Sequence, residues 1–362
     1  MEPLPDELSP RRLWRRLAQL AAVAVVIGVI VLTGPGLGEL RTRLTHASVG
    51  WLFAAVGLEA LSALAYVVIF RAVFCPRMRW GLSYQIGMSE QGANSVLSVS
   101  GVGGLALGAW ALHRGGMSTA QIGRKSVAFF LLTSLPNVSA VIIFAALFLV
   151  GAFGDDPDRA LTYGLGAAAL LVTILVLALP RWLQSRAPAG ATDAKPGRLA
   201  AVRRFARDSL AQGIRDALDL LRRRSPGVLI GAWGTMAFDL TVLGACFLAF
   251  GHGPPLGVLV LGYLIGQLGG NLPVPGGVGG LDAGLIGVFV LYHQPLAVST
   301  AAVLVYHGIS LWVPGLLGSV AFLQLRRTLL REEQPAALCI PLVEPIQAVF
   351  APLVAATGAR PD

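Results

Sequence analysis

The sequence predicts an all-α polytopic membrane protein with about six crossing helices, two Gly-broken hairpins and an inverted-topology repeat. Three observations lead to this prediction. The 362 residues are 55% apolar and only 13% charged, about half the charged fraction of a soluble globular domain. The apolar residues gather into runs of roughly twenty, the length of a spanning helix. A glycine-rich pentapeptide also occurs twice. This composition excludes a water-soluble enzyme, a disordered chain and a coiled coil.

Six apolar runs are long enough to cross a bilayer. They cover residues 17–33, 49–70, 126–150, 161–180, 228–250 and 297–323. Two further apolar stretches, 82–112 and 256–293, are interrupted by Gly clusters and amides. Each predicts a hairpin of two short helices that enters and leaves on one side. Four arginines precede the first run, as in a signal peptide. No small-x-small cleavage site follows it, so we expect an uncleaved helix.

The basic residues indicate the orientation. A net charge of +9 would suggest a nucleic-acid partner in a soluble protein. Here the basic residues lie between the apolar runs, where the positive-inside rule explains them. We therefore expect no nucleic acid, a cell-membrane location and both termini in the cytoplasm. Five segments placed in the cytoplasm hold 25 of the 28 Lys and Arg residues. These segments are residues 1–16, 71–80, 113–125, 181–226 and 326–362.

The predicted organisation has four parts. They are a cytoplasmic N-terminus (1–16), membrane repeat 1 (17–150), membrane repeat 2 (161–323) and a cytoplasmic tail (324–362). Repeat 2 includes the basic loop 181–226, whose apolar residues recur at helical spacing. The expected apolar face consists of Leu199, Val202, Ala206, Leu210, Ile214, Leu218 and Leu221. The loop is either an amphipathic helix on an anionic leaflet or an ordinary positive-inside anchor.

The repeat is visible in the letters of the sequence. Residues 101–105 (Gly-Val-Gly-Gly-Leu) recur as residues 277–281. An acid precedes each hairpin at a similar distance, Glu59 in one half and Asp239 in the other. An odd number of crossings separates the hairpins, so the second copy is inverted, as in many transporters. Coincidence in a Gly-rich chain is the alternative. The predicted helix breaks lie at Gly101, Gly103, Gly104, Gly277, Gly279 and Gly280.

The second motif resembles a known family. Asn271-Leu-Pro-Val-Pro-Gly-Gly-Val-Gly-Gly-Leu-Asp282 is followed by Val305-Tyr-His307 and Trp312-Val-Pro314-Gly. This pattern is similar to the lysylphosphatidylglycerol synthase transmembrane family, a flippase-like membrane domain, over roughly residues 10–330. The resemblance implies an integral membrane protein linked to lipid translocation. The fused aminoacyltransferase domain of some relatives is not expected after residue 330, so synthesis of lysyl-lipid is not expected either.

Three positions depart from that family pattern. Relatives often carry an acidic residue and an Arg after the first Gly pair, where this chain has Leu105 and Gly108. An Arg-Glu pair is common in the second motif, where this chain has Leu281 and Asp282. The Arg that often follows the Tyr is His307 here. Because basic site residues are missing, the resemblance leaves the substrate open.

Acids lie inside the predicted membrane segments, and Lys and Arg do not. A charge at the bilayer centre costs about 2.5–3.5 kcal/mol on insertion scales. Such acids either form helix–helix hydrogen bonds or make a cation or proton site. His307 is either structural or a proton carrier, and Gln267 could add hydrogen bonds. The predicted substrate-binding residues are Asp282, Glu59, Glu90, Asn94, Asp239, Asn271, Tyr306 and His307.

The expected function is translocation of a lipid or lipid-linked molecule between leaflets. The alternatives are a non-transporting lipid-binding subunit that docks a separate catalytic protein through the basic loop, and a membrane-embedded transferase. No hydrolase, zinc or nucleotide-binding motif appears, so we expect neither enzymatic activity nor a cofactor or metal. The three cysteines are far apart and suggest no disulfide framework. Membrane lipids are the expected partners, with a cytoplasmic or membrane enzyme as a further candidate.

Overall fold

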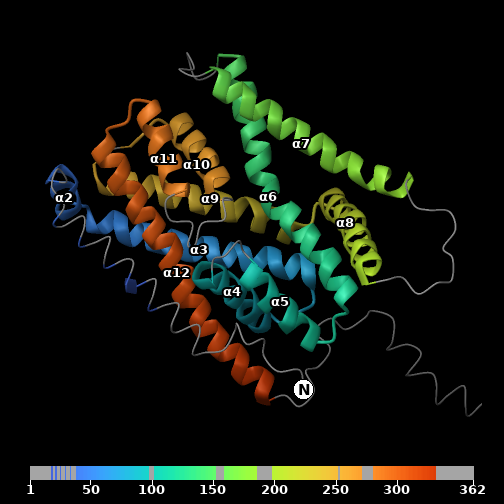
Figure 1. Ribbon diagram of the computed structural model, residues 1–362. Helices are drawn as coiled ribbons and strands as arrows, with labels where there is room; N and C mark the ends of the chain where they lie inside the picture. The colour runs from blue at the N-terminus through green and yellow to red at the C-terminus, as the bar shows by residue number, and fades with distance from the viewer. Residues whose placement is uncertain are drawn as a thin grey trace, which may run out of the picture.

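The computed structural model describes residues 38–97, 102–151, 159–185, 198–251, 253–270 and 280–331, with a few single positions between 18 and 33. Within these ranges the chain forms eleven helices and no strand (Figure 1). The helices are α2 (Gly38–Thr45), α3 (Val49–Phe74), α4 (Trp80–Leu97), α5 (Val102–Arg114), α6 (Thr119–Leu149), α7 (Arg159–Ser185), α8 (Arg198–Arg222), α9 (Pro226–Ala249), α10 (Leu256–Gly270), α11 (Gly280–Leu291) and α12 (Leu296–Arg331). The predicted all-α polytopic class is confirmed.

Four of the described helices are long and apolar enough to cross a membrane. They are α3, α6, α9 and α12, and each covers all but at most the last residue of one predicted run. The predicted run 161–180 lies in α7, whose apolar part, Gly166–Pro180, is shorter than these four. The run 17–33 lies almost entirely outside the described residues. The helix α2 was not predicted, and α12 extends to Arg331, beyond the expected boundary at residue 323.

Two helices from opposite halves of the chain form the centre of the molecule. α3 and α9 lie side by side through the middle of Figure 1. Along this contact Gly227 faces Ala72, Gly231 faces Ile69 and Gly234 faces Ala65, so the two helices are antiparallel. A Cβ atom on Gly231 would lie 2.6 Å from Ile69 Cβ. Small residues thus allow the close approach, as is common between membrane helices.

Each half also contains an antiparallel pair of short helices. In the first, Asn94 and Glu90 of α4 face Gly104 and Gly108 of α5. In the second, Gly262 and Gly266 of α10 face Phe289 and Leu285 of α11. Helices α5, α10 and α11 have 13, 15 and 12 residues. At about 1.5 Å per residue, they are shorter than the roughly 30 Å hydrocarbon core. The expected hairpins of short helices are present.

The helix contacts of the two halves correspond, with one exception. Helices α3, α4, α5 and α6 correspond in order to α9, α10, α11 and α12. Five contacts of the first set thus have counterparts: α3–α4 in α9–α10, α3–α6 in α9–α12, α3–α12 in α9–α6, α4–α5 in α10–α11 and α5–α6 in α11–α12. The exception is α4–α12, an extensive contact, whose counterpart α10–α6 is slight. The long helices α6 and α12 each also contain an internal proline, Pro136 and Pro314.

The basic loop contains a helix, as predicted, and its buried face differs in part from the expected one. α8 packs against α6 (Figure 1), where Phe205 and Ser209 lie against Gly123 and Gly213 lies against Val127. Ile214, on the expected face, is buried. Val202 and Leu210, expected on the buried face, are 58% and 40% exposed. The reason is the close approach of α8 to α6, where a Cβ atom on Gly213 would lie 2.6 Å from Val127 Cβ. The side of α8 that faces α6 therefore runs through Phe205, Ser209 and Gly213, and not through Leu210.

The cysteines differ in state. Cys246 is free and buried in the core between α9 and its neighbours. Cys75, directly after α3, is disulfide-bonded. The cysteine spacing gave no indication of this bond, because a fold can bring together cysteines that are distant in sequence.

Candidate functional site

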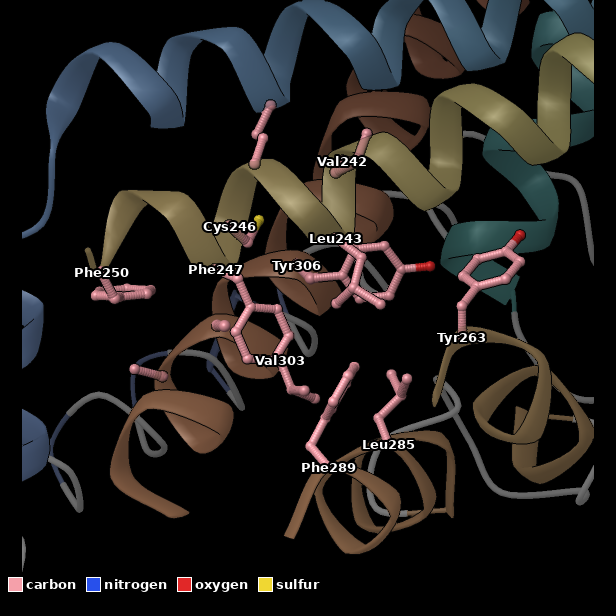
Figure 2. Packing of buried hydrophobic residues seen from close by; sticks show 14 of the residues in the cluster. Val242, Leu243, Cys246, Phe247, Phe250, Tyr263, Leu285, Phe289, Val303 and Tyr306 are labelled. Carbon is pink, nitrogen blue, oxygen red and sulfur yellow. The ribbon is translucent and has the colours of Figure 1, made fainter. Parts of the chain in front are cut away.

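A carboxyl group at the centre of the molecule receives three hydrogen bonds. Asp239 of α9 accepts at Oδ2 from the Tyr263 hydroxyl at 2.8 Å and from Gln267 Nε2 at 3.2 Å. Its Oδ1 accepts from the Tyr306 hydroxyl at 3.0 Å. Figure 2 shows Tyr263 at one end of the buried cluster beside α9, with the hydroxyl of Tyr306 pointing toward it. Helices α10 and α12 therefore converge on α9 through polar groups.

The other half supplies a second carboxyl group to the same region. Glu59 of α3 is only 4% exposed. One turn along α3, the Ser62 hydroxyl donates to the Thr235 carbonyl of α9 at 3.2 Å, which fixes the register of the two helices. This register brings Glu59 level with Asp239, and the two carboxyl groups lie within electrostatic range. Glu59 Oε2 is buried and has no hydrogen-bond partner among the described residues.

A third acid lies on the first hairpin. Glu90 of α4 is 2% exposed and accepts from the Tyr66 hydroxyl of α3 at 3.1 Å. One turn further, Asn94 Oδ1 accepts from the backbone N–H of Gly104 at 3.0 Å. A Cβ atom at residue 108 would overlap the Glu90 carboxyl group. Gly108 therefore leaves the space that this carboxyl group occupies.

The fourth acid forms a close pair with a histidine. Asp282 lies in the first turn of α11, where a helix N-terminus stabilises negative charge. Its Oδ1 atom is 3.0 Å from His307 Nδ1 of α12. The imidazole Nε2 atom is buried and has no partner among the described residues. The sequence alone suggested that these two residues could meet, and the structure brings them together.

The predicted site residues thus fall into three groups. Glu59, Asp239 and Tyr306 meet at the α3–α9 contact, Glu90 and Asn94 line the first hairpin, and Asp282 pairs with His307. Gly103 and Gly104 lie in the first turn of α5, and Gly280 is the first residue of α11. Asn271, Gly101, Gly277 and Gly279 lie outside the described residues.

Two residues of the site were not predicted. Tyr66 and Tyr263 are the hydrogen-bond partners of Glu90 and Asp239. Each tyrosine lies 24 positions from its acid in the sequence. In the first half the acid, Glu90, lies on the hairpin, and in the second half the acid, Asp239, lies on the long helix α9. This shared spacing was a signal in the sequence that could have identified both.

The chemistry of the site is acidic and hydroxyl-rich. Two basic side chains of the bundle lie near helix ends, Arg71 of α3 and Lys125 of α6. Lys125 donates to the Val73 carbonyl at 2.7 Å, and Arg71 donates to the Met78 carbonyl at 2.7 Å. Among the described residues, no three His, Cys, Asp or Glu side chains are grouped to hold a metal ion. The arrangement can bind protons, cationic groups and hydrogen-bond donors.

A family model described as the lysylphosphatidylglycerol synthase TM region matches residues 17–318. The chain belongs to this family. With its four long apolar helices, it is an integral membrane protein of a family linked to lipids. No curated protein and no solved structure matches the chain.

Gly108 and His307 each lie beside an acid. Gly108 makes room for Glu90, which accepts from the Tyr66 hydroxyl. His307 meets Asp282. These two acids therefore contact a hydroxyl group and an imidazole ring.

Proposed function

We propose that the protein translocates a lipid or lipid-linked molecule between the leaflets of the cell membrane, with both termini in the cytoplasm. The observation that carries the proposal is the set of buried acids where the two halves of the chain meet. Inverted-repeat transporters bind their substrates at such an interface, near the bilayer midplane. Ionisable residues at membrane depth are costly and usually functional.

The matched halves support an inverted-topology repeat. Helices α3 to α6 and α9 to α12 make corresponding contacts, and their leading helices are antiparallel. The α4–α12 contact is extensive, whereas its counterpart α10–α6 is slight. Such a difference is expected when a transporter with two equivalent halves adopts one of its two alternating conformations. Exchange of these two contacts would expose the acids to opposite sides of the membrane in turn.

The acids also indicate the class of headgroup. A cationic or zwitterionic headgroup would gain an opposite charge beside Asp239 or Asp282, whereas an anionic headgroup would meet repulsion. The hydroxyl oxygens of Tyr263 and Tyr306, whose protons are donated to Asp239, can accept hydrogen bonds from headgroup N–H groups. No covalent step is part of this proposal, and we propose no enzymatic activity.

The test is reconstitution of the full chain in vesicles containing trace fluorescent lipid. The probes are NBD-labelled phosphatidylethanolamine, lysyl-phosphatidylglycerol and phosphatidylglycerol, and dithionite quenching measures how fast each crosses. We expect the zwitterionic and cationic probes to cross faster than in protein-free vesicles and faster than the anionic probe. Asp239→Asn should abolish the difference between probes.

Glu39→Gln is the matched control, because Glu39 is an exposed acid on α2, 3.8 Å from Arg43. It should translocate as the unaltered protein does. Failure of all three probes to cross, with correctly inserted and thermally stable protein, would contradict translocation of these headgroup classes.

The second candidate function is a lipid-binding subunit that docks a separate enzyme. It is favoured by the surface of α8, whose buried face packs on α6 while Arg203, Arg204 and Arg222 are exposed. Arg124 of α6 fixes α8 through an ion pair with Asp216 at 2.8 Å. Replacement of Arg203 and Arg204 by Gln separates the functions. Loss of cellular function with unchanged translocation would favour docking.

A further inference from the structure

The two central acids occupy equivalent places in the two halves. Glu59 and Asp239 lie on α3 and α9, which correspond to each other in the matched contacts and pack antiparallel. Equivalent residues of an antiparallel pair can meet only at the axis that relates the two helices. The carboxyl groups therefore lie where the halves meet, and not within either half.

Their surroundings are unequal. Three donors, from Tyr263, Gln267 and Tyr306, satisfy both oxygens of Asp239. Glu59 Oε2 is buried without a hydrogen-bond partner among the described residues. A buried polar atom without a partner is rare and needs an explanation. A second ionised carboxylate beside Asp239 would also be an uncompensated buried charge.

We infer that Glu59 and Asp239 form a proton-binding site that couples proton movement to translocation, with Glu59 as the proton carrier. This inference rests on the proposed function. A proton from one side binds the Glu59 carboxylate and forms a neutral O–H group. After the α4–α12 and α10–α6 contacts exchange, that O–H bond breaks and the proton passes to water on the other side. Asp239, held by its three donors, keeps its place in both states.

A proton fits this site better than a metal cation. Tyr263, Tyr306 and Gln267 direct O–H and N–H groups at Asp239, so they occupy three of the roughly four lone pairs that its carboxylate offers to a cation. A hard cation such as Ca²⁺ takes about six to eight oxygen ligands. A proton needs only one carboxylate oxygen, and Glu59 Oε2 is that atom.

The groups facing Glu59 come from several helices. Asp239 and Cys246 lie on α9, Tyr306 on α12 and Tyr263 on α10, each within electrostatic range of Glu59. On α4, the acid Glu90 is bonded to Tyr66, two turns along α3 from Glu59.

The titratable groups of α6 lie further away. Lys125 donates to the carbonyl of Val73, near the far end of α3, and Arg124 pairs with Asp216. Asp239 is therefore the charged group that a proton on Glu59 would most affect.

The experiment uses the full chain in vesicles with a pH-sensitive dye inside and NBD-phosphatidylethanolamine as the probe. Translocation is measured with equal pH on both sides and with an imposed gradient of about one unit, a roughly tenfold ratio of proton activity. We expect the gradient to change the rate of probe translocation severalfold, up to about tenfold. We also expect the dye to report proton movement across the membrane when the probe is translocated. Glu59→Gln should retain probe movement down its own gradient but lose the response to pH.

A second readout does not depend on transport. A protonated carboxyl group has an infrared C=O band that a carboxylate lacks. The pH-dependent band should be present in the unaltered protein and absent in Glu59→Gln, while Glu39→Gln should keep it. Glu59→Asp, which keeps a carboxyl group, covers the case in which Glu59→Gln does not fold.

The outcomes separate this inference from the proposed function. Probe movement that ignores the pH gradient in the unaltered protein overturns the coupling and leaves translocation intact. Absence of any probe movement overturns the proposed function, and the infrared band then decides whether the proton site exists. An unchanged band in Glu59→Gln shows that another group carries the proton and overturns the assignment.

Discussion

Gly92 of α4 and Gly318 of α12 meet so closely that a Cβ atom on Gly92 would lie 2.7 Å from Gly318 Cα. This backbone contact lies in the α4–α12 pair, which has no equal in the other half. A glycine pair at a helix crossing lets two membrane helices approach closely. It also makes the contact sensitive to a single methyl group.

The first prediction is that Gly92→Ala destabilises the observed state. Ala favours helix over Gly by about 1 kcal/mol, but overpacking against backbone costs about 1–3 kcal/mol. We expect a net loss, seen as a lower melting temperature in detergent. Gly57→Ala on α3 is the control, because no atom lies within 4 Å of the added Cβ. Equal melting temperatures for the two variants would argue against a tight α4–α12 contact.

The second prediction is that α4 and α12 must separate during translocation. Met88 of α4 and Ala321 of α12 belong to one buried cluster, so cysteines at these two positions can be linked by a cleavable bifunctional thiol reagent. The link should stop NBD-phosphatidylethanolamine movement, and reduction should restore it. A link between cysteines at Ala145 and Gly166, which meet at the α6–α7 contact, should leave movement unchanged. Full activity of the α4–α12-linked protein would refute exchange of the two contacts.

The third prediction concerns Asp282. Asn retains much of the helix-capping ability of Asp while removing its charge. Asp282→Asn should therefore express and melt almost normally, with a loss of about 1 kcal/mol or less from the helix dipole. Its lipid translocation should be lost because His307 no longer faces a carboxylate. Unchanged translocation would leave Asp282 as a helix cap and direct attention to Glu59, Glu90 and Asp239.

The fourth prediction concerns the Tyr66–Glu90 hydrogen bond. Tyr66→Phe should destabilise the protein by about 1–3 kcal/mol, because it leaves a buried carboxyl oxygen without its donor. Tyr84→Phe, on α4, is the control, since its hydroxyl forms no hydrogen bond with the described residues. Thermal unfolding in the same detergent compares them. If both changes have the same small effect, the hydroxyl of Tyr66 does not stabilise Glu90.

The fifth prediction concerns topology. From the distribution of Lys and Arg, we expect the basic loop to lie in the cytoplasm. A membrane-impermeant thiol reagent applied to intact cells should miss a cysteine at Ala191 and label one at Asp156. Opening the cells should make Ala191 accessible. Strong external labelling at Ala191 would reverse the orientation and, with it, the side to which each hairpin opens.

Much of the fold could be predicted because hydrophobic length and glycine placement are local signals. The runs that became α3, α6, α9 and α12 each carry enough apolar residues to span by themselves. The hairpins were marked by the glycines that let their arms meet. α2 was missed because its eight residues, Gly38–Thr45, include polar and charged side chains and form no apolar run.

The site was harder to predict because it depends on contacts between helices. The acids stood out as charges at membrane depth, but their partners did not. Tyr66 and Tyr263 look like ordinary aromatic residues in apolar runs. The meeting of Glu59 with Asp239 follows from the antiparallel register of α3 and α9, which glycines fix in space. Part of the predicted apolar face of α8, Val202 and Leu210, is exposed for the same reason, since the packing against α6 selects which side of α8 is buried.

The central α3–α9 pair also affects how the protein is made. The carboxyl group of Glu59 leaves the ribosome about 180 residues before that of Asp239. At roughly 5–20 residues per second, α3 waits on the order of ten to forty seconds for its partner. During that time Glu59 cannot be buried against α9, and the core of the first half is incomplete. We therefore expect α3 to stay in contact with the insertion machinery or a membrane chaperone until α9 has been synthesised.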